Sequence, residues 1–82
     1  MRIEYDPQSD AAYIYFVQDI GAGGVAKTYA CDPAAVDGQI HLDFDDKGRL
    51  LGLEILDASS FLPAKLLAKA PGPGQALGEA PA

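Results

Sequence analysis

The chain has 82 residues, a formal net charge of −6, one cysteine and one histidine. A chain this short buries only about 60% of its unfolded surface, so we expect one small domain with a marginal core. Cys31 has no partner for an intrachain disulfide, and one cysteine with one histidine cannot complete a zinc site alone. The acidic balance repels nucleic acid, and no window holds the roughly 20 apolar residues of a membrane span. We therefore expect no direct nucleic acid partner and no membrane partner.

The first two strands are predicted in residues 1–6 and 11–17. In MRIEYD, Ile3 and Tyr5 alternate with polar residues, which is the period of a half-buried strand. Residues 7–10 have turn chemistry, and the AAYIYFV run after them is rich in aromatic and branched side chains, which predicts a hairpin. Both faces of its second strand are apolar: Tyr13, Tyr15 and Val17 on one, Ala12, Ile14 and Phe16 on the other. We expect this strand to be central and covered on both faces.

Three further strands are predicted in the middle of the chain. VAKTYAC, residues 25–31, follows a glycine-rich connection, and QIHLDF, residues 39–44, alternates apolar with polar side chains. LLGLEIL, residues 50–56, follows a tight turn in which Gly48 supplies a positive φ. The register that gathers the apolar residues of the last two strands on one face pairs Phe44 with Leu51, Leu42 with Leu53, Ile40 with Ile55, His41 with Glu54, and Asp43 with Gly52.

One short helix is predicted after the last strand. Ser59 or Ser60 can cap it, and Pro63 is tolerated in its first turn. Segment 70–82 is rich in Pro, Gly and Ala and cannot bury enough apolar area to offset the entropy of ordering, so we expect a disordered tail after a domain of residues 1–69. The predicted fold class is α+β, mainly β: a single antiparallel sheet of about five strands with one short C-terminal helix.

Two short motifs match ligand-binding loops only in part. Counted from Asp43, acidic residues fall at positions 1, 3 and 12 with Gly48 at position 6, the skeleton of a calcium-binding EF-hand loop. Lys47 stands at position 5, where a ligand oxygen is needed, and the flanks have strand patterns, so we expect a hairpin without a metal. In GAGGVAKT, residues 21–28, Ala26 replaces the second glycine of a phosphate-binding loop and no helix follows. Neither motif predicts a cofactor.

His41, Asp43 and Glu54 are the candidates for chemistry, on the polar side of the predicted sheet with Thr28 as an expected neighbour. A histidine beside a carboxylate can do general acid–base work or hold a metal. An exposed strand face with a His and Glu pair across the ladder explains the same residues without any catalysis. The sequence leaves both interpretations open: a small enzyme or metal-binding protein that uses these three residues, or a protein with no catalytic, cofactor-binding or metal-binding residue.

Two landmarks resemble those of the family known as domain of unknown function 2283. They are YDP-x-x-DA-x-Y near the start and D-x-x-GR-L-x-G-x-E-I-L-x-A-S later, and the resemblance covers residues 3–63. It implies no established chemistry. Some relatives look like small companions of toxin-like proteins, which by analogy implies an antitoxin-like partner.

We expect a cytoplasmic homodimer that acts as a non-catalytic protein-interaction module. The small core and a second strand that is apolar on both faces favour a second subunit against the candidate interface residues Tyr13, Tyr15 and Val17. The acidic surface favours a basic partner protein. The sequence MRIEYDP shows no signal-peptide pattern, and a lone cysteine fits a reducing compartment.

Overall fold

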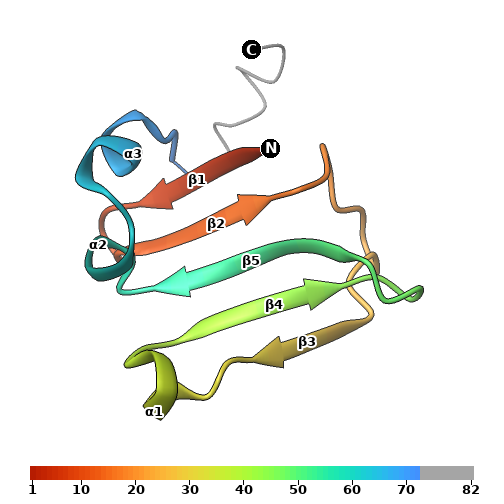
Figure 1. Cartoon of the computed structure of the whole chain (residues 1–82). Helices are drawn as coiled ribbons and strands as arrows, with labels where there is room; N and C mark the ends of the chain where they lie inside the picture. The colour runs from red at the N-terminus through yellow and green to blue at the C-terminus, as the bar shows by residue number, and fades with distance from the viewer. Residues whose placement is uncertain (73–82) are drawn as a thin grey trace.

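The computed structural model describes residues 1–72 and shows a five-stranded antiparallel sheet (Figure 1). Its strands, in chain order, are β1 (Arg2–Asp6), β2 (Ala11–Tyr15), β3 (Lys27–Ala30), β4 (Ile40–Phe44) and β5 (Leu50–Leu56). Across the sheet the order is β1-β2-β5-β4-β3. The predicted mainly β fold with one antiparallel sheet is confirmed. The central strand is β5, with β2 beside it.

The prediction of a single helix was wrong, because the structure has three short ones. They are α1 (Pro33–Val36), α2 (Ala58–Phe61) and α3 (Ala64–Lys69). The signals for α1 were present in the sequence: the Asp32 carboxylate accepts a hydrogen bond from the backbone N–H of Ala34 at 3.1 Å, and a proline occupies the first helical position. A four-residue helix is little longer than one turn, so its apolar residues show no recognisable helical periodicity in the sequence.

The C-terminal helical segment is divided at Pro63. A proline disfavours helical backbone angles in the residue before it, and Leu62 is extended, with φ −113° and ψ 146°. Ser59 and Ser60 therefore lie within α2 instead of capping one longer helix. Asp57, in the left-handed region at φ 53°, precedes α2.

The segment with EF-hand spacing folds as the predicted β4–β5 hairpin. Observed pairs are Ile40 with Ile55, His41 with Glu54, Leu42 with Leu53, and Asp43 with Gly52, as predicted. The predicted pair of Phe44 with Leu51 is not observed, because Phe44 pairs with Leu50. Asp45 and Arg49 close the turn, so two residues of β5 stand opposite one of β4, which is a β-bulge. Gly48 has the predicted positive φ, 79°.

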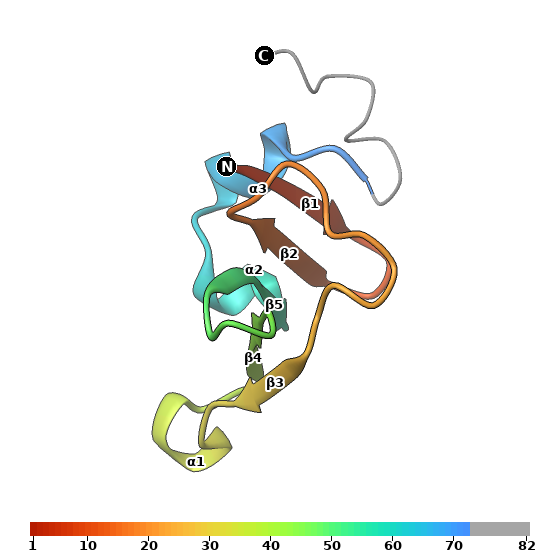
Figure 2. The same ribbon diagram turned by 90° about the vertical axis from the view of Figure 1, so that its right-hand side faces the viewer.

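The core lies between one face of the sheet and helices α2 and α3, which Figure 2 shows on the same side of the strands. Among the described residues, four apolar ones are buried: Ala12, Ile55, Ala58 and Leu67. Within residues 1–72, no large side chain is completely buried. The apolar contribution to stability is correspondingly small, because it scales with the area removed from water.

Asp10 fastens the β1–β2 turn to the start of α2. Its carboxylate accepts hydrogen bonds from the Tyr5 hydroxyl at 2.7 Å, from the Ser59 hydroxyl at 2.7 Å and from the Ser59 backbone N–H at 3.0 Å. Its backbone carbonyl accepts from the N–H of Ala58 at 2.9 Å. Residues from both sequence landmarks therefore meet at this carboxylate.

The chain end that the structure describes runs along the outer edge of β1. The carbonyl of Pro71 accepts a hydrogen bond from the backbone N–H of Tyr5 at 2.8 Å. Residues 73–82, which make up most of the predicted tail, lie outside the described residues. Within residues 1–72, none of the helices has the length and apolar character needed to cross a membrane.

Candidate functional site

The face of the sheet opposite α2 and α3 carries polar and aromatic side chains from all five strands. Successive strand residues point to opposite faces, so the observed register decides which side chains share this one. We call the following set the polar layer: Arg2, Glu4, Tyr13, Tyr15, Thr28, His41, Asp43 and Glu54. The layer contains the three predicted chemical candidates and two of the three predicted interface residues. The third, Val17, follows β2 and is half-buried.

Asp43 is the best-anchored carboxylate of the polar layer. The Tyr13 hydroxyl donates to its Oδ2 at 2.6 Å, and the Thr28 hydroxyl donates to its Oδ1 at 2.6 Å. Thr28 comes from the neighbouring strand β3, but Tyr13 lies two strands away on β2 and must reach across β5. Gly52 makes that reach possible, because a Cβ at this position would come within 2.6 Å of the Tyr13 ring.

His41 and Glu54 form the pair that the register predicted. His41 Nδ1 lies 2.9 Å from Glu54 Oε1. An ionised carboxylate can only accept hydrogen bonds, so Nδ1 carries the proton and Nε2 is the acceptor nitrogen of the neutral ring. The candidates thus divide into two groups, since both oxygens of Asp43 are bound by hydroxyls and neither is bound by His41.

Tyr15 extends the polar layer to the edge of the sheet. Its ring centroid lies 4.7 Å from that of Tyr13, and the guanidinium carbon of Arg2 lies 4.0 Å above its ring. Its hydroxyl donates to Glu4 Oε1 at 3.1 Å. The sequence had suggested Tyr13 and Tyr15 as apolar interface residues and missed these hydrogen bonds. A glycine in the interior of a strand, Gly52, was the signal for a close approach.

The charges of the polar layer fix the roles of its tyrosines. Burial and the hydrogen bond to Asp43 raise the pKa of Tyr13 well above its ordinary value of 10. Burial and the charge of Glu4 raise the pKa of Tyr15, although Arg2 opposes that shift. Both phenols therefore remain hydrogen-bond donors near neutral pH.

We expect the protein to lose stability as the pH rises above 10. A phenol whose folded pKa is raised contributes stability that is present below the unfolded pKa and is lost as the pH rises through the folded one. Tyr13→Phe should remove the largest part of this loss, and at pH 7 it should lower the free energy of unfolding by about 1 kcal/mol, the net value of one hydrogen bond. Urea unfolding between pH 7 and the alkaline limit measures both effects. Tyr29→Phe, at an exposed position, is the control, and an unchanged alkaline loss in Tyr13→Phe would contradict the assignment.

A small hollow adjoins the polar layer beside Tyr13. It has a volume of about 210 Å³ and contains three carboxylates, those of Glu4, Asp6 and Glu54. Small residues of β2 and of the first turn complete its wall: Ser9, Ala11 and Ala12. We call it the acidic hollow. Its chemistry suits a cationic group, because each carboxylate can accept several hydrogen bonds.

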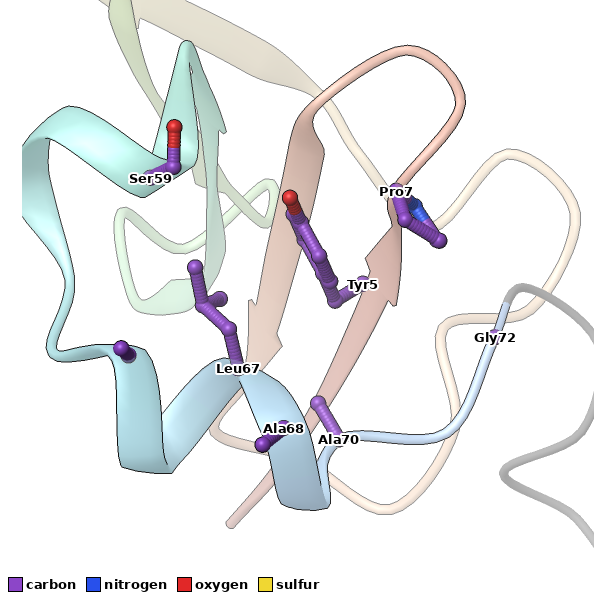
Figure 3. Close-up of a pocket in the computed structure, with 8 residues that line it drawn as sticks. Tyr5, Pro7, Ser59, Leu67, Ala68, Ala70 and Gly72 are labelled. Atoms are coloured by element: carbon purple, nitrogen blue, oxygen red, sulfur yellow. The ribbon is translucent and has the colours of Figure 1, made fainter.

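A larger groove lies on the other side of the molecule, between β1 and α3 (Figure 3). It has a volume of about 630 Å³, and its wall is mostly methyl groups and aliphatic carbon, including Leu67 and Ala68. The two hydroxyls at its rim, those of Tyr5 and Ser59, are bonded to Asp10. The groove is therefore mainly apolar and offers less specific chemistry than the polar layer.

The arrangement of ligand-type residues bears on metal binding. Residues 1–72 contain no cluster of three or more His, Cys, Asp or Glu side chains with an arrangement that could hold a metal ion. The free thiol of Cys31 is half-buried at the end of β3, away from the polar layer.

The sequence was also compared with known proteins. Residues 2–59 match the family described as "Protein of unknown function (DUF2283)". This stretch includes every strand, α1 and the first two residues of α2. Searches of curated proteins and of solved structures found no match.

Proposed function

The chain belongs to the DUF2283 family of proteins of unknown function, and we propose that it is a non-catalytic interaction module that binds a basic partner protein on its polar layer. The observation that carries the proposal is the charge of the uncovered sheet face. Among residues 1–72, this face has four carboxylates and one guanidinium. The carboxylates are those of Glu4, Asp43, Glu54 and the adjoining Asp6, and the guanidinium is that of Arg2. Such a face attracts a basic surface and repels an acidic one.

The polar layer is held in place before any partner arrives. Tyr13 and Thr28 fix Asp43 at 2.6 Å each, and Tyr15 contacts Glu4 at 3.1 Å. Side chains that are already ordered lose little conformational entropy on binding, which favours affinity. The acidic hollow then provides a specific place for one lysine or arginine of the partner. By analogy with relatives that resemble companions of toxin-like proteins, we propose that the partner is a toxin-like protein, which would make this chain antitoxin-like.

Removing charge from the acidic hollow should weaken binding of a lysine- and arginine-rich peptide. We expect Glu4→Gln combined with Glu54→Gln to raise the dissociation constant about thirtyfold, because each of the two ion pairs contributes on the order of 1 kcal/mol. Isothermal titration calorimetry at low salt measures this. The matched control is Asp19→Asn with Asp46→Asn. It removes the same number of negative charges, but from exposed positions outside the polar layer. Equal weakening by both variants would show general attraction to an acidic protein and would contradict the proposed site.

The His41–Glu54 pair supports one alternative, a small enzyme or metal-binding protein that uses His41, Asp43 and Glu54. An imidazole oriented by a carboxylate is the arrangement that a general base requires. Purifying the protein from its native cell and determining the mass and metal content of the complex separates the two functions. A stoichiometric basic protein without metal supports the module. A bound metal that His41→Ala abolishes supports the alternative.

A further inference from the structure

Helices α2 and α3 cover only one end of their side of the sheet. They pack against β1, β2 and β5 and against the start of β4, at the end of the sheet near the first hairpin turn (Figures 1 and 2). The other end of this face carries five large apolar side chains, which we call the apolar patch: Phe16, Tyr29, Leu42, Phe44 and Leu50. Tyr29 pairs with Leu42, and Phe44 pairs with Leu50, so the patch is continuous across β3, β4 and β5.

Three of the five residues of the apolar patch are exposed to water, and Leu42 and Phe44 are half-buried. Tyr29 is 55% exposed, Phe16 43% and Leu50 38%. Contiguous exposed apolar surface of this kind marks an interaction site on a soluble protein. The patch also lies on a chain whose own core contains only four buried apolar residues among those described. Covering it would add the apolar burial that the single chain lacks.

The two ends of the apolar patch have opposite charge. At the β4–β5 turn, Lys27, Lys47 and Arg49 outnumber the two carboxylates there, and Arg49 Nε lies 2.9 Å from Asp45. At the other end of β3 and β4 lies α1, an apolar turn flanked by Asp32 and Asp37. No lysine or arginine occurs between residues 30 and 46. Figure 2 shows α1 displaced toward the helix side of the sheet, the side of the patch.

We propose that a second copy of this chain covers the apolar patch, related by a twofold axis that reverses the strand direction. This reversal brings α1 of one copy, with its two aspartates, to the basic end of the other, and the contact occurs twice. A hollow of about 380 Å³ beside Phe44 is the place where α1 docks. Its wall contains Lys27 and Gly48 together with Asp45 and Asp46. The Asp45 carboxylate is already paired with Arg49.

The dimer leaves the polar layer accessible. The hydroxyls of Tyr13 and Tyr15 are bonded within their own chain, so these two groups do not need a second copy as a hydrogen-bond partner. The proposed interface thus lies on the opposite side of the sheet from the residues that the sequence suggested. It does not depend on the basic partner, and either proposal can fail alone.

Sedimentation of the full chain over a range of concentrations tests the dimer. We expect a reversible dimer whose dissociation constant Leu50→Glu raises more than tenfold, because association would bury an unpaired charge. Leu66→Glu is a matched control, the same substitution at a leucine 39% exposed on α3, and should change the constant less than twofold. Circular dichroism checks folding. Should Leu50→Glu not fold, Tyr29→Glu at the exposed edge strand replaces it.

A second variant tests the charge arrangement. Lys27→Gln with Lys47→Gln should weaken the dimer about as strongly as raising the salt concentration does, because both remove attraction between the ends. A monomer at about 100 μM, the upper range of specific weak association, would overturn the proposal. A dimer that neither Leu50→Glu nor Tyr29→Glu weakens would also overturn it. A dimer that is lost only in Tyr15→Glu would place the interface on the polar layer instead.

Discussion

Gly52→Ala is expected to lower the free energy of unfolding by about 3 kcal/mol, near the upper end of the usual cost of overpacking. A Cβ at this position would lie 2.5 Å from the carbonyl oxygen of Ile14 and 2.6 Å from the ring of Tyr13. The carbonyl belongs to the backbone of the neighbouring strand and can move only if β2 and β5 separate. The ring could move only by giving up its hydrogen bond to Asp43. Chemical denaturation of the purified variant measures the loss.

A matched glycine provides the control for Gly52→Ala. Gly21 has nothing within 4 Å of an added Cβ and no positive φ, so Gly21→Ala should change stability by less than about 0.5 kcal/mol. Spectroscopic titration adds a second readout, because a displaced Tyr13 would lose its raised pKa. Equal stability of the two variants would show that Tyr13 does not lie over Gly52.

Asp10→Ala is the second substitution for which we expect a large effect. It removes the acceptor of three hydrogen bonds from Tyr5 and Ser59, and it places alanine at φ 55°, which aspartate tolerates better. We expect the melting temperature to fall by about 10 °C, the scale for losing hydrogen bonds to a charged group in a domain of this size. Asp10→Asn keeps the shape and part of the hydrogen bonding and should fall less. Near-native melting of both variants would contradict the role of Asp10 as the fastener.

The same carboxylate should make stability depend on acid pH. Hydrogen bonds from Ser59 and Tyr5 lower the pKa of Asp10 below its ordinary 3.8. A group with a lowered folded pKa contributes stability that is present above the unfolded pKa and is lost as the pH falls through the folded one. Stability should therefore decrease below about pH 4, and the decrease should be smaller in Asp10→Asn. The turn carboxylate of Asp45, whose pKa the backbone N–H of Arg49 lowers, acts in the same direction.

Each of the two sequence landmarks contributes residues to two different parts of the structure. Tyr5 and Asp10 from the first and Ser59 from the second form the fastener between the first hairpin and α2. Tyr13 from the first, with Gly52 and Glu54 from the second, belongs to or shapes the polar layer. One set therefore specifies the fold, and the other specifies the surface on which the proposed function depends.

The sequence by itself determined the strands and most of the register of the β4–β5 hairpin. Alternating apolar residues, an Asp-Pro turn and Gly48 act over a few neighbouring residues, so their consequences can be predicted without the rest of the chain. His41 opposite Glu54 followed directly from that register. The interruption of the helical segment at Pro63 is equally local, since a proline restricts the backbone of the residue before it. The helical pattern of the neighbouring residues concealed this interruption.

Only the tertiary structure decided which face the helices cover and which side chains meet across strands that are not neighbours. Tyr13 bonds Asp43 over Gly52 because β5 lies between β2 and β4, and that strand order involves pairing between residues about 40 positions apart. The uncovered apolar patch has the same origin, because α2 and α3 are too short to extend over β3 and the far end of β4. Periodicity shows that a strand has an apolar side, whereas the packing of distant segments determines what covers it.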